Sequence, residues 1–204
     1  GLPIRIGNAA GVTSLAVDLV YDQALLAITA ATLGAGLPAD WSVNPPDTST
    51  PGVAKIRASG TAPLSGTNVE VVRLTAAVPS DAPYGAVQAI RPENVSLNGG
   101  AIAAIGDLAV HKAAYLGDAD GSGIHSSADA FLAVQAALRL ASGFAAHAWT
   151  DPRIVGDADG SGVLSAADAF LIVQEGLGLA EPFVPDNPHI TVTPVGGGVD
   201  PQFQ

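Results

Sequence analysis

The sequence GDADGSGIHSSADAFLAVQAALRL at residues 117–140 returns at residues 156–179 as GDADGSGVLSAADAFLIVQEGLGL. The two segments match at 17 of 24 positions, with a constant offset of 39 residues. Identity of this extent at a fixed offset indicates an internal duplication, in which each copy is one supersecondary unit that packs against its neighbour. The duplicated segment therefore decides the fold of this part of the chain.

Each copy reads as an acidic, glycine-rich loop followed by a helix. Apolar residues recur at helical spacing, as Phe131, Val134 and Leu138 in the first copy and as Phe170, Val173 and Leu177 in the second. A helix with one apolar stripe does not bury that stripe alone. We therefore expect the two helices to pack antiparallel and to bury the stripes against each other, at about 1.5–3 kcal/mol for each large side chain.

The two loops carry oxygen-bearing side chains at fixed positions. Counted from the first aspartate, positions 1, 3, 5, 9 and 12 are Asp118, Asp120, Ser122, Ser126 and Asp129 in the first copy, and Asp157, Asp159, Ser161, Ser165 and Asp168 in the second. A glycine at position 6 permits a sharp turn, and Ile124 and Val163 at position 7 would each contribute a backbone carbonyl. This is the ligand spacing of an EF-hand loop, so the sequence predicts two bound calcium ions.

Two other properties of the loops bear on this prediction. Aspartates that only cap helices would account for one or two acids in each copy, but not for five oxygens at fixed offsets. Each site has three carboxylates, with serine at position 5, which favours micromolar-to-millimolar affinity and calcium over magnesium.

The closing aspartate at position 12, and short apolar leads in place of a helix before each loop (Tyr115-Leu116 and Ile154-Val155), differ from a plain EF-hand. A doubled loop-helix of this kind, over residues 115–182, resembles the dockerin family. The resemblance implies that the calcium pair folds the module and that its helices bind a cohesin-type protein domain. The residues before each closing aspartate, Ser127-Ala128 and Ala166-Ala167, differ from the Ser-Thr pair of cellulosomal examples. We therefore do not expect a cellulosomal partner, and we expect the extra length at residues 145–149 to form an added helical turn or a surface loop.

Residues 1–110 read as short strands separated by turns. Leu15, Val17, Leu19 and Tyr21 alternate, as expected for a half-buried strand. The alternation at residues 69–78 shifts its phase, which predicts a β-bulge, and Asn98-Gly99 predicts a hairpin turn. The pattern favours an all-β sandwich.

Two fragments of this region, Tyr21-Asp22 with Leu25 and the segment SDAPYG at residues 80–85, resemble the cohesin family. The resemblance implies a jelly-roll-like sandwich that receives dockerins, including that of another copy of this chain. Carbohydrate-binding modules share this architecture, so a polysaccharide-binding sandwich anchored through a dockerin is the alternative. Trp41 and Trp149 are the aromatic candidates for a sugar platform.

Composition limits the remaining function classes. The 19 acidic residues outnumber the 8 basic ones, which argues against nucleic acid and anionic membranes as partners. No apolar run has the length of a membrane span, and no cysteine is present. The four histidines lack ligand spacing and are interpreted as surface residues, and no nucleophile signature is present, so we expect no enzyme activity. The dockerin resemblance implies a secreted protein, extracellular or at the cell surface.

The predicted organisation is a cohesin-like β-sandwich at 1–110, an all-α dockerin at 111–184 and an extended C-terminal tail at 185–204. The sequence begins with Gly1 and shows no charged-then-apolar leader before its first strand-like segment, so we expect a processed product or an excised fragment. Residues 2–8 look like the second strand of a cohesin. In the tail, Ile190 and Val192 alternate with threonine after a proline-rich linker. We therefore expect the tail to donate a strand to the sandwich of its own chain or of the next copy.

Overall fold

The computed structural model describes residues 1–148, 150–179 and 184. The chain divides into two compact units, Gly1–Ala113 and Ala114–Gln204, called here the β unit and the loop-helix unit. The predicted limit at residue 110 falls inside strand β8 (Ala109–Lys112), which pairs with strand β7 (Val87–Leu97) and so belongs to the β unit.

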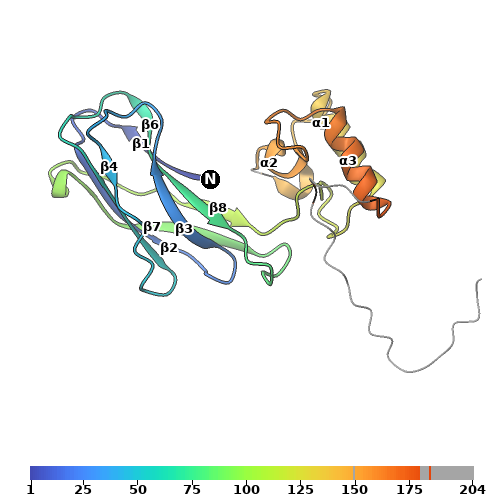
Figure 1. Cartoon of the computed structure of the whole chain (residues 1–204), viewed down its shortest axis with the longest axis horizontal. Helices are drawn as coiled ribbons and strands as arrows, with labels where there is room; N and C mark the ends of the chain where they lie inside the picture. Colours follow the sequence, from blue (N-terminus) through green and yellow to red (C-terminus); the bar gives the residue numbers. More distant parts are fainter. Residues whose placement is uncertain (149, 180–183, 185–204) are drawn as a thin grey trace, which may run out of the picture. The chain divides into compact units, whose positions relative to one another are not determined.

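The β unit is built from two antiparallel sheets that face each other (Figure 1). The strands other than β7 and β8 are β1 (Leu2–Asn8), β2 (Ser14–Val20), β3 (Ala27–Leu33), β4 (Ser42–Val43), β5 (Val53–Ser59) and β6 (Thr67–Ala77). One sheet has the order β1-β6-β3 and the other β4-β5-β2-β7-β8. The predicted β-sandwich is therefore confirmed.

Alternate residues of both sheets form one hydrophobic core. Leu15, Val17 and Leu19 of β2 are buried, and Tyr21 beyond the strand is buried as well, as their alternation predicts. Ile56 of β5 is fully buried and belongs to the same cluster. Because side chains alternate across a strand, each sheet presents an apolar face to the other.

The predicted bulge lies in β6. Ile4 of β1 pairs with Val72 and Arg5 pairs with Glu70, so Val71 has no counterpart in β1. Val71 and Val72 are both fully buried, because the extra residue lets two successive side chains avoid solvent.

The turn predicted at Asn98-Gly99 is present, but a second strand does not follow. These residues form the 3-10 helix η1 (Asn98–Gly100), after which a single bridge joins Leu97 to Ile102. The Asn98 side chain explains the difference. Its Oδ1 accepts hydrogen bonds from the amides of Thr13 (2.7 Å) and Ser14 (3.1 Å), so the turn is fixed to the β1–β2 connection and is not continued as a hairpin.

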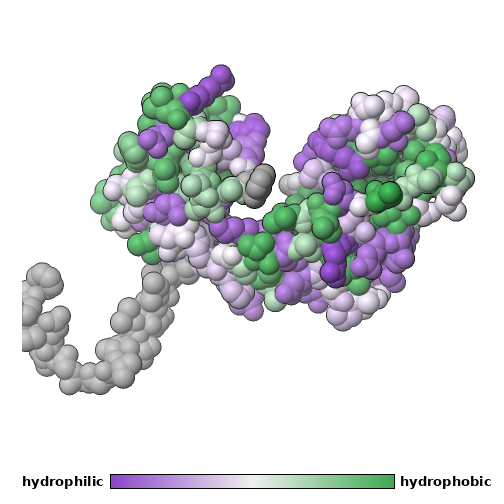
Figure 2. Space-filling model, turned by 180° about the vertical axis from the view of Figure 1, so that it is seen from behind, coloured by the Kyte–Doolittle hydropathy of each residue, from purple (hydrophilic) through white to green (hydrophobic). Residues whose placement is uncertain are grey.

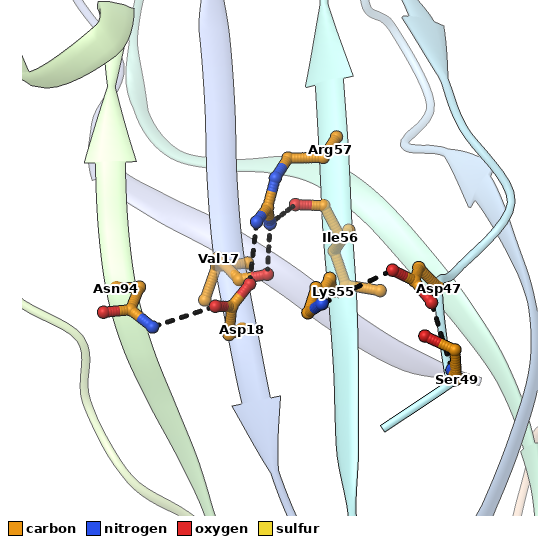
Figure 3. Close-up of polar contacts among 8 residues, drawn as sticks. All are labelled: Val17, Asp18, Asp47, Ser49, Lys55, Ile56, Arg57 and Asn94. Atoms are coloured by element: carbon orange, nitrogen blue, oxygen red, sulfur yellow. Dashed lines mark hydrogen bonds and ion pairs between the residues drawn. The ribbon is translucent and has the colours of Figure 1, made fainter. Parts of the chain in front are cut away.

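A polar contact crosses the centre of the five-stranded sheet (Figure 3). Asp18 of β2 accepts hydrogen bonds from Asn94 Nδ2 of β7 (2.9 Å) and from Arg57 of β5 (2.8 Å). The hydrogen bond from Asn94, followed by that from Arg57, lowers the pKa of the Asp18 carboxyl. Asp18 therefore joins three strands.

The described loop-helix unit contains two long helices and two short ones. They are α1 (Ser127–Ala137), the 3-10 helix η2 (Ala145–His147), α2 (Pro152–Gly156) and α3 (Ala166–Gly176). Helix α2 directly precedes the second loop, so the prediction that no helix precedes either loop is wrong there. Asp151 caps α2 and Pro152 opens its first turn, a favourable helix start that the sequence analysis missed. Of the two alternatives for residues 145–149, a helical turn or a surface loop, the described structure has a helical turn at 145–147, which is η2.

The prediction that the apolar stripes of the helices bury each other holds only for Val134 and Val173, which pack against the core between the helices. It is wrong for the larger members of both stripes, which are exposed: Phe131, Leu138, Phe170 and Leu177. Helices α1 and α3 pack mainly through alanines, with Ala130 and Ala133 of α1 in one cluster with Ala169 and Ile172 of α3. Phe131 lies about 100° around the helix from Ala130, and Leu138 shares its face one heptad later. The alanine face of α1 is therefore the buried one, which leaves Phe131 and Leu138 on the outside.

Candidate metal sites and partner surface

Three aspartates converge in each loop. One carboxylate oxygen from each of Asp118, Asp120 and Asp129 lies within 4.8 Å of the other two, and the same holds for Asp157, Asp159 and Asp168. Asp118, Asp129 and Asp168 are fully buried. The loops therefore bring together the residues predicted at positions 1, 3 and 12 of each copy.

The first aspartate of each loop organises the turn. Asp118 accepts hydrogen bonds from the amides of Gly121 (2.9 Å), Ser122 (3.1 Å) and Gly123 (2.8 Å). Asp157 accepts them from Ser161 (3.0 Å) and Gly162 (2.7 Å). Gly123 and Gly162 have φ of 86° and 82°, a conformation that glycine adopts without strain. Position 6 is thus occupied by glycine for the reason that the sequence suggested.

The closing aspartates connect each loop to its helix. Asp129 Oδ2 accepts hydrogen bonds from the amide and the hydroxyl of Ser126, both at 2.8 Å. Asp168 accepts the same pair from Ser165, at 2.7 and 3.0 Å. Ser126 and Ser165 are the N-cap residues, and each forms a capping box with its aspartate. The serines predicted as position-9 ligands therefore act as helix caps in this structure.

The oxygens of positions 5 and 7 lie side by side. Ser122 Oγ donates to the carbonyl of Ile124 at 3.1 Å, and Ser161 Oγ donates to that of Val163 at 3.2 Å. The Ile124 and Val163 side chains are exposed, so these residues face the serine of their own loop only with the backbone carbonyl oxygen. This arrangement fits the predicted contribution of a carbonyl at position 7.

The chemistry of the clusters fits a hard cation. Carboxylates held this close together repel one another. Burial raises the pKa of Asp129, which shows that its charge is costly in the folded chain. The Ser122 and Ser161 side chains lower the pKa of Asp120 and of Asp159, respectively, through hydrogen bonds. Each triad can hold a metal ion, whose charge would offset this repulsion.

Two buried histidines lie beside the first loop. His125 Nε2 donates to the carbonyl of Leu116 at 2.7 Å, and His147 Nε2 donates to the carbonyl of Asp118 at 2.8 Å. The prediction that the histidines are surface residues is therefore wrong for His125 and His147. A signal was present in the duplication, because Leu164 occupies the position of His125 in the second copy. A position that is apolar in one copy is a candidate for burial in the other.

The outer faces of α1 and α3 carry equivalent apolar residues. Phe131 and Leu138 are 61% and 64% exposed, and their counterparts Phe170 and Leu177 are 63% and 69% exposed. Figure 2 shows hydrophobic residues at the surface of this unit, the one joined to the grey trace. Large exposed apolar side chains that share a helix face are typical of binding surfaces.

Of the two tryptophans considered for a sugar platform, the structure describes Trp41. Trp41 is buried in the core, and its Nε1 donates to the Ala62 carbonyl at 2.9 Å, so it is not available for stacking on a sugar. Trp149 and His189 lie outside the described residues.

An apolar groove opens beside the edge strand β1. It has a volume of about 780 Å³ and is lined by β1, by residues 103–107 and by core residues such as Leu15 and Ile90. This edge could accept a donated strand. The tail at residues 185–204 lies outside the described residues, so strand donation stays a prediction.

Comparisons with known proteins yield little. No family model matches the chain, and no curated protein matches it either. Among solved structures, one match is a cohesin module from the family 33 glycoside hydrolase of Clostridium perfringens ATCC13124, with 11% identity and a TM-score of 0.39. The match covers 52% of this chain and 73% of that chain. No described helix is long and apolar enough to cross a membrane.

Proposed function

We propose that this chain is a calcium-dependent assembly protein of the cohesin–dockerin type, in which the loop-helix unit acts as the dockerin. The observation that carries the proposal is the pair of aspartate triads at the starts of α1 and α3, each fixed by the same capping contacts. We place the protein outside the cell or at its surface, and we assign it no enzyme activity.

Calcium is the ion that suits the donor set. Each loop offers three carboxylates, a serine hydroxyl and a backbone carbonyl, all of them oxygen ligands. Calcium accepts six to eight oxygens in flexible geometry, whereas magnesium requires a smaller octahedron. Asp118, Asp120, Ser122, Ile124 and Asp129 would hold one ion, and their counterparts in the second copy would hold the other. Bound calcium would offset most of the negative charge of each triad and so stabilise both helix starts.

The partner surface is the exposed apolar face of each helix. Phe131 with Leu138, and Phe170 with Leu177, give two equivalent faces related by the duplication. Burial of these side chains by a partner would remove a large apolar area from water and so favour binding. The partner we propose is a cohesin-type sandwich, including the β unit of another copy. Contacts of that head-to-tail kind give rings or filaments.

The test is light scattering of the purified full chain after size exclusion, in calcium and in EGTA. We expect a larger, concentration-dependent mass in calcium only. A monomer under both conditions would overturn self-assembly. In that case binding to purified cohesin-type modules would be measured by calorimetry, and heat that does not depend on calcium, or no heat at all, would overturn the proposed function.

A further inference from the structure

The two loops are duplicates, but their surroundings differ in a systematic way. By the offset of 39, His125 corresponds to Leu164, and Glu175 corresponds to Ala136. His125 Nδ1 lies 3.9 Å from Glu175 Oε1, so the first loop contacts α3 through polar groups. The corresponding residues Leu164 and Ala136 pack together in an apolar cluster with Phe144 and Val155. The contact between a loop and the helix of the other copy is therefore polar for the first loop and apolar for the second.

The first loop is held by two imidazole rings. A carbonyl oxygen only accepts hydrogen bonds, so Nε2 of each ring must carry the proton and donate it. His125 holds the carbonyl of Leu116 and His147 that of Asp118, and both rings are buried. These carbonyls lie at the entrance of the loop, where Asp118 supplies the first carboxylate.

Among the described residues, the entrance of the second loop is held by backbone groups instead of imidazole rings. The Val155 carbonyl, the counterpart of that of Leu116, accepts a hydrogen bond of 2.6 Å from the amide of Gly117. The Asp157 carbonyl accepts a hydrogen bond of 3.3 Å from the amide of Gly160, within the same loop. Leu164, in the place of His125, has no hydrogen to donate to a carbonyl. Asp118 is fully buried, whereas Asp157 is only half-buried. In the described part of the chain, the first triad is therefore the more buried one, and it is the one whose entrance is held by side chains.

We propose that His125 and His147 are positioning residues that make the two calcium sites unequal. The inference rests on the calcium function proposed above. Groups that orient a ligand without touching the metal change metal affinity by about 10- to 100-fold, and a preformed site loses less freedom when the ion binds. The first ion enters the Asp118 site, and the second enters the Asp157 site with an affinity about tenfold lower.

The test is a calorimetric titration of the full chain with calcium chloride, which resolves two steps if the sites differ. Asp157→Asn should remove the weaker step and retain the tighter one. His147→Leu should weaken the tighter step by about tenfold or more and leave the weaker step in place, while His147→Gln, which keeps a donor, should restore part of the loss.

A matched variant uses the duplication itself. His125→Leu combined with Glu175→Ala gives the first copy the contact that the second copy already has, without leaving a carboxylate buried beside an apolar residue. We expect the affinities of the two steps to converge. Should His147→Leu fail to fold, this double variant and Asp157→Asn decide the question.

Three outcomes would overturn the inference: two wild-type sites of equal affinity, loss of the tighter step in Asp157→Asn, or equal weakening of both steps in His147→Leu. An absence of calcium binding in the wild type is a separate result, because it overturns the proposed function instead.

Discussion

The backbone amide of Asp120 donates a hydrogen bond of 2.9 Å to Asp129 Oδ1, which joins the third residue of the first loop to the first turn of α1. Asp159 and Asp168 repeat the contact at 3.1 Å in the second copy. Each closing carboxylate thus belongs to the loop and to the helix together. A change in the charge of the loop must therefore affect the stability of the helix that follows it.

Removal of calcium should unfold the helices of the loop-helix unit, because repulsion among the three carboxylates then acts at each helix start. We expect far-ultraviolet circular dichroism to lose helical signal in EGTA, to regain it with excess calcium and to regain less with magnesium. A spectrum and melting temperature that are the same with and without EGTA would contradict this.

Asp118→Ala and Asp157→Ala should each reduce the calcium stoichiometry from two ions to one, since each removes the carboxylate around which one loop folds. Calorimetric titration of the full chain measures the stoichiometry. Asp151→Ala is a suitable control, because Asp151 caps α2 but belongs to neither triad. Two ions bound to Asp118→Ala would refute the assignment of the first site.

Ser126→Ala separates the role of a helix cap from that of a metal ligand. Loss of the cap should lower the free energy of unfolding by about 1 kcal/mol, while two calcium ions still bind. Urea unfolding at saturating calcium measures the first quantity and calorimetry the second. A stoichiometry of one ion would show that the Ser126 hydroxyl is a required ligand.

Phe131→Ala together with Phe170→Ala should abolish calcium-dependent association, because the double variant truncates both apolar faces. Each single variant should retain one face and therefore bind. Both side chains are exposed, so the melting temperature should hardly change. Ile154→Ala, an equally exposed apolar truncation in α2, is the matched control and should associate like the wild type.

Asp18→Asn should destabilise the β unit at neutral pH, by about 1.5–3 kcal/mol at most, since hydrogen bonds to a charged group are involved. The folded-state pKa of Asp18 is lowered, so its stabilisation is present above the unfolded pKa and is lost as the pH falls through the folded value. The difference between variant and wild type in urea unfolding should therefore shrink in acid. Asp47→Asn, which removes an exposed pair with Lys55, should have a smaller effect (Figure 3). A difference that stays constant down to acid pH would contradict the assignment.

Deletion of residues 186–204 tests strand donation to the edge of β1. If the tail occupies the groove there, the truncated chain should lose its oligomers or melt at a lower temperature, and it should still bind two calcium ions. An unchanged melting temperature and oligomeric state would make the tail a linker.

The spacing of the ligands could be predicted from the sequence because a tight loop with glycine at a fixed position leaves its oxygens few directions in which to point. The sandwich could be predicted for a similar reason, since Leu15, Val17 and Leu19 alternate at the period that a strand imposes. Both features depend on residues close together in the chain.

The features that the sequence did not reveal depend on distant partners. The helical period predicts that Phe131 and Leu138 lie on the buried face, but α1 and α3 pack through residues such as Ala130 and Ala169. A pattern that is read from large apolar residues does not identify alanines as the contact. His147 looks like an exposed residue in an alanine-rich segment until the fold brings it to the Asp118 carbonyl, 29 residues earlier.

The contacts of Asn98 also affect when the β unit can form during synthesis. Its side chain binds the amides of Thr13 and Ser14, 85 and 84 residues earlier, and β2 pairs with both β5 and β7. A sheet with such distant pairing folds slowly, because the chain must close long loops before the contacts repay the lost entropy. During translation the five-stranded sheet is therefore completed only after β7 and Asn98 have left the ribosome, and apolar surface that is exposed until then is prone to aggregate.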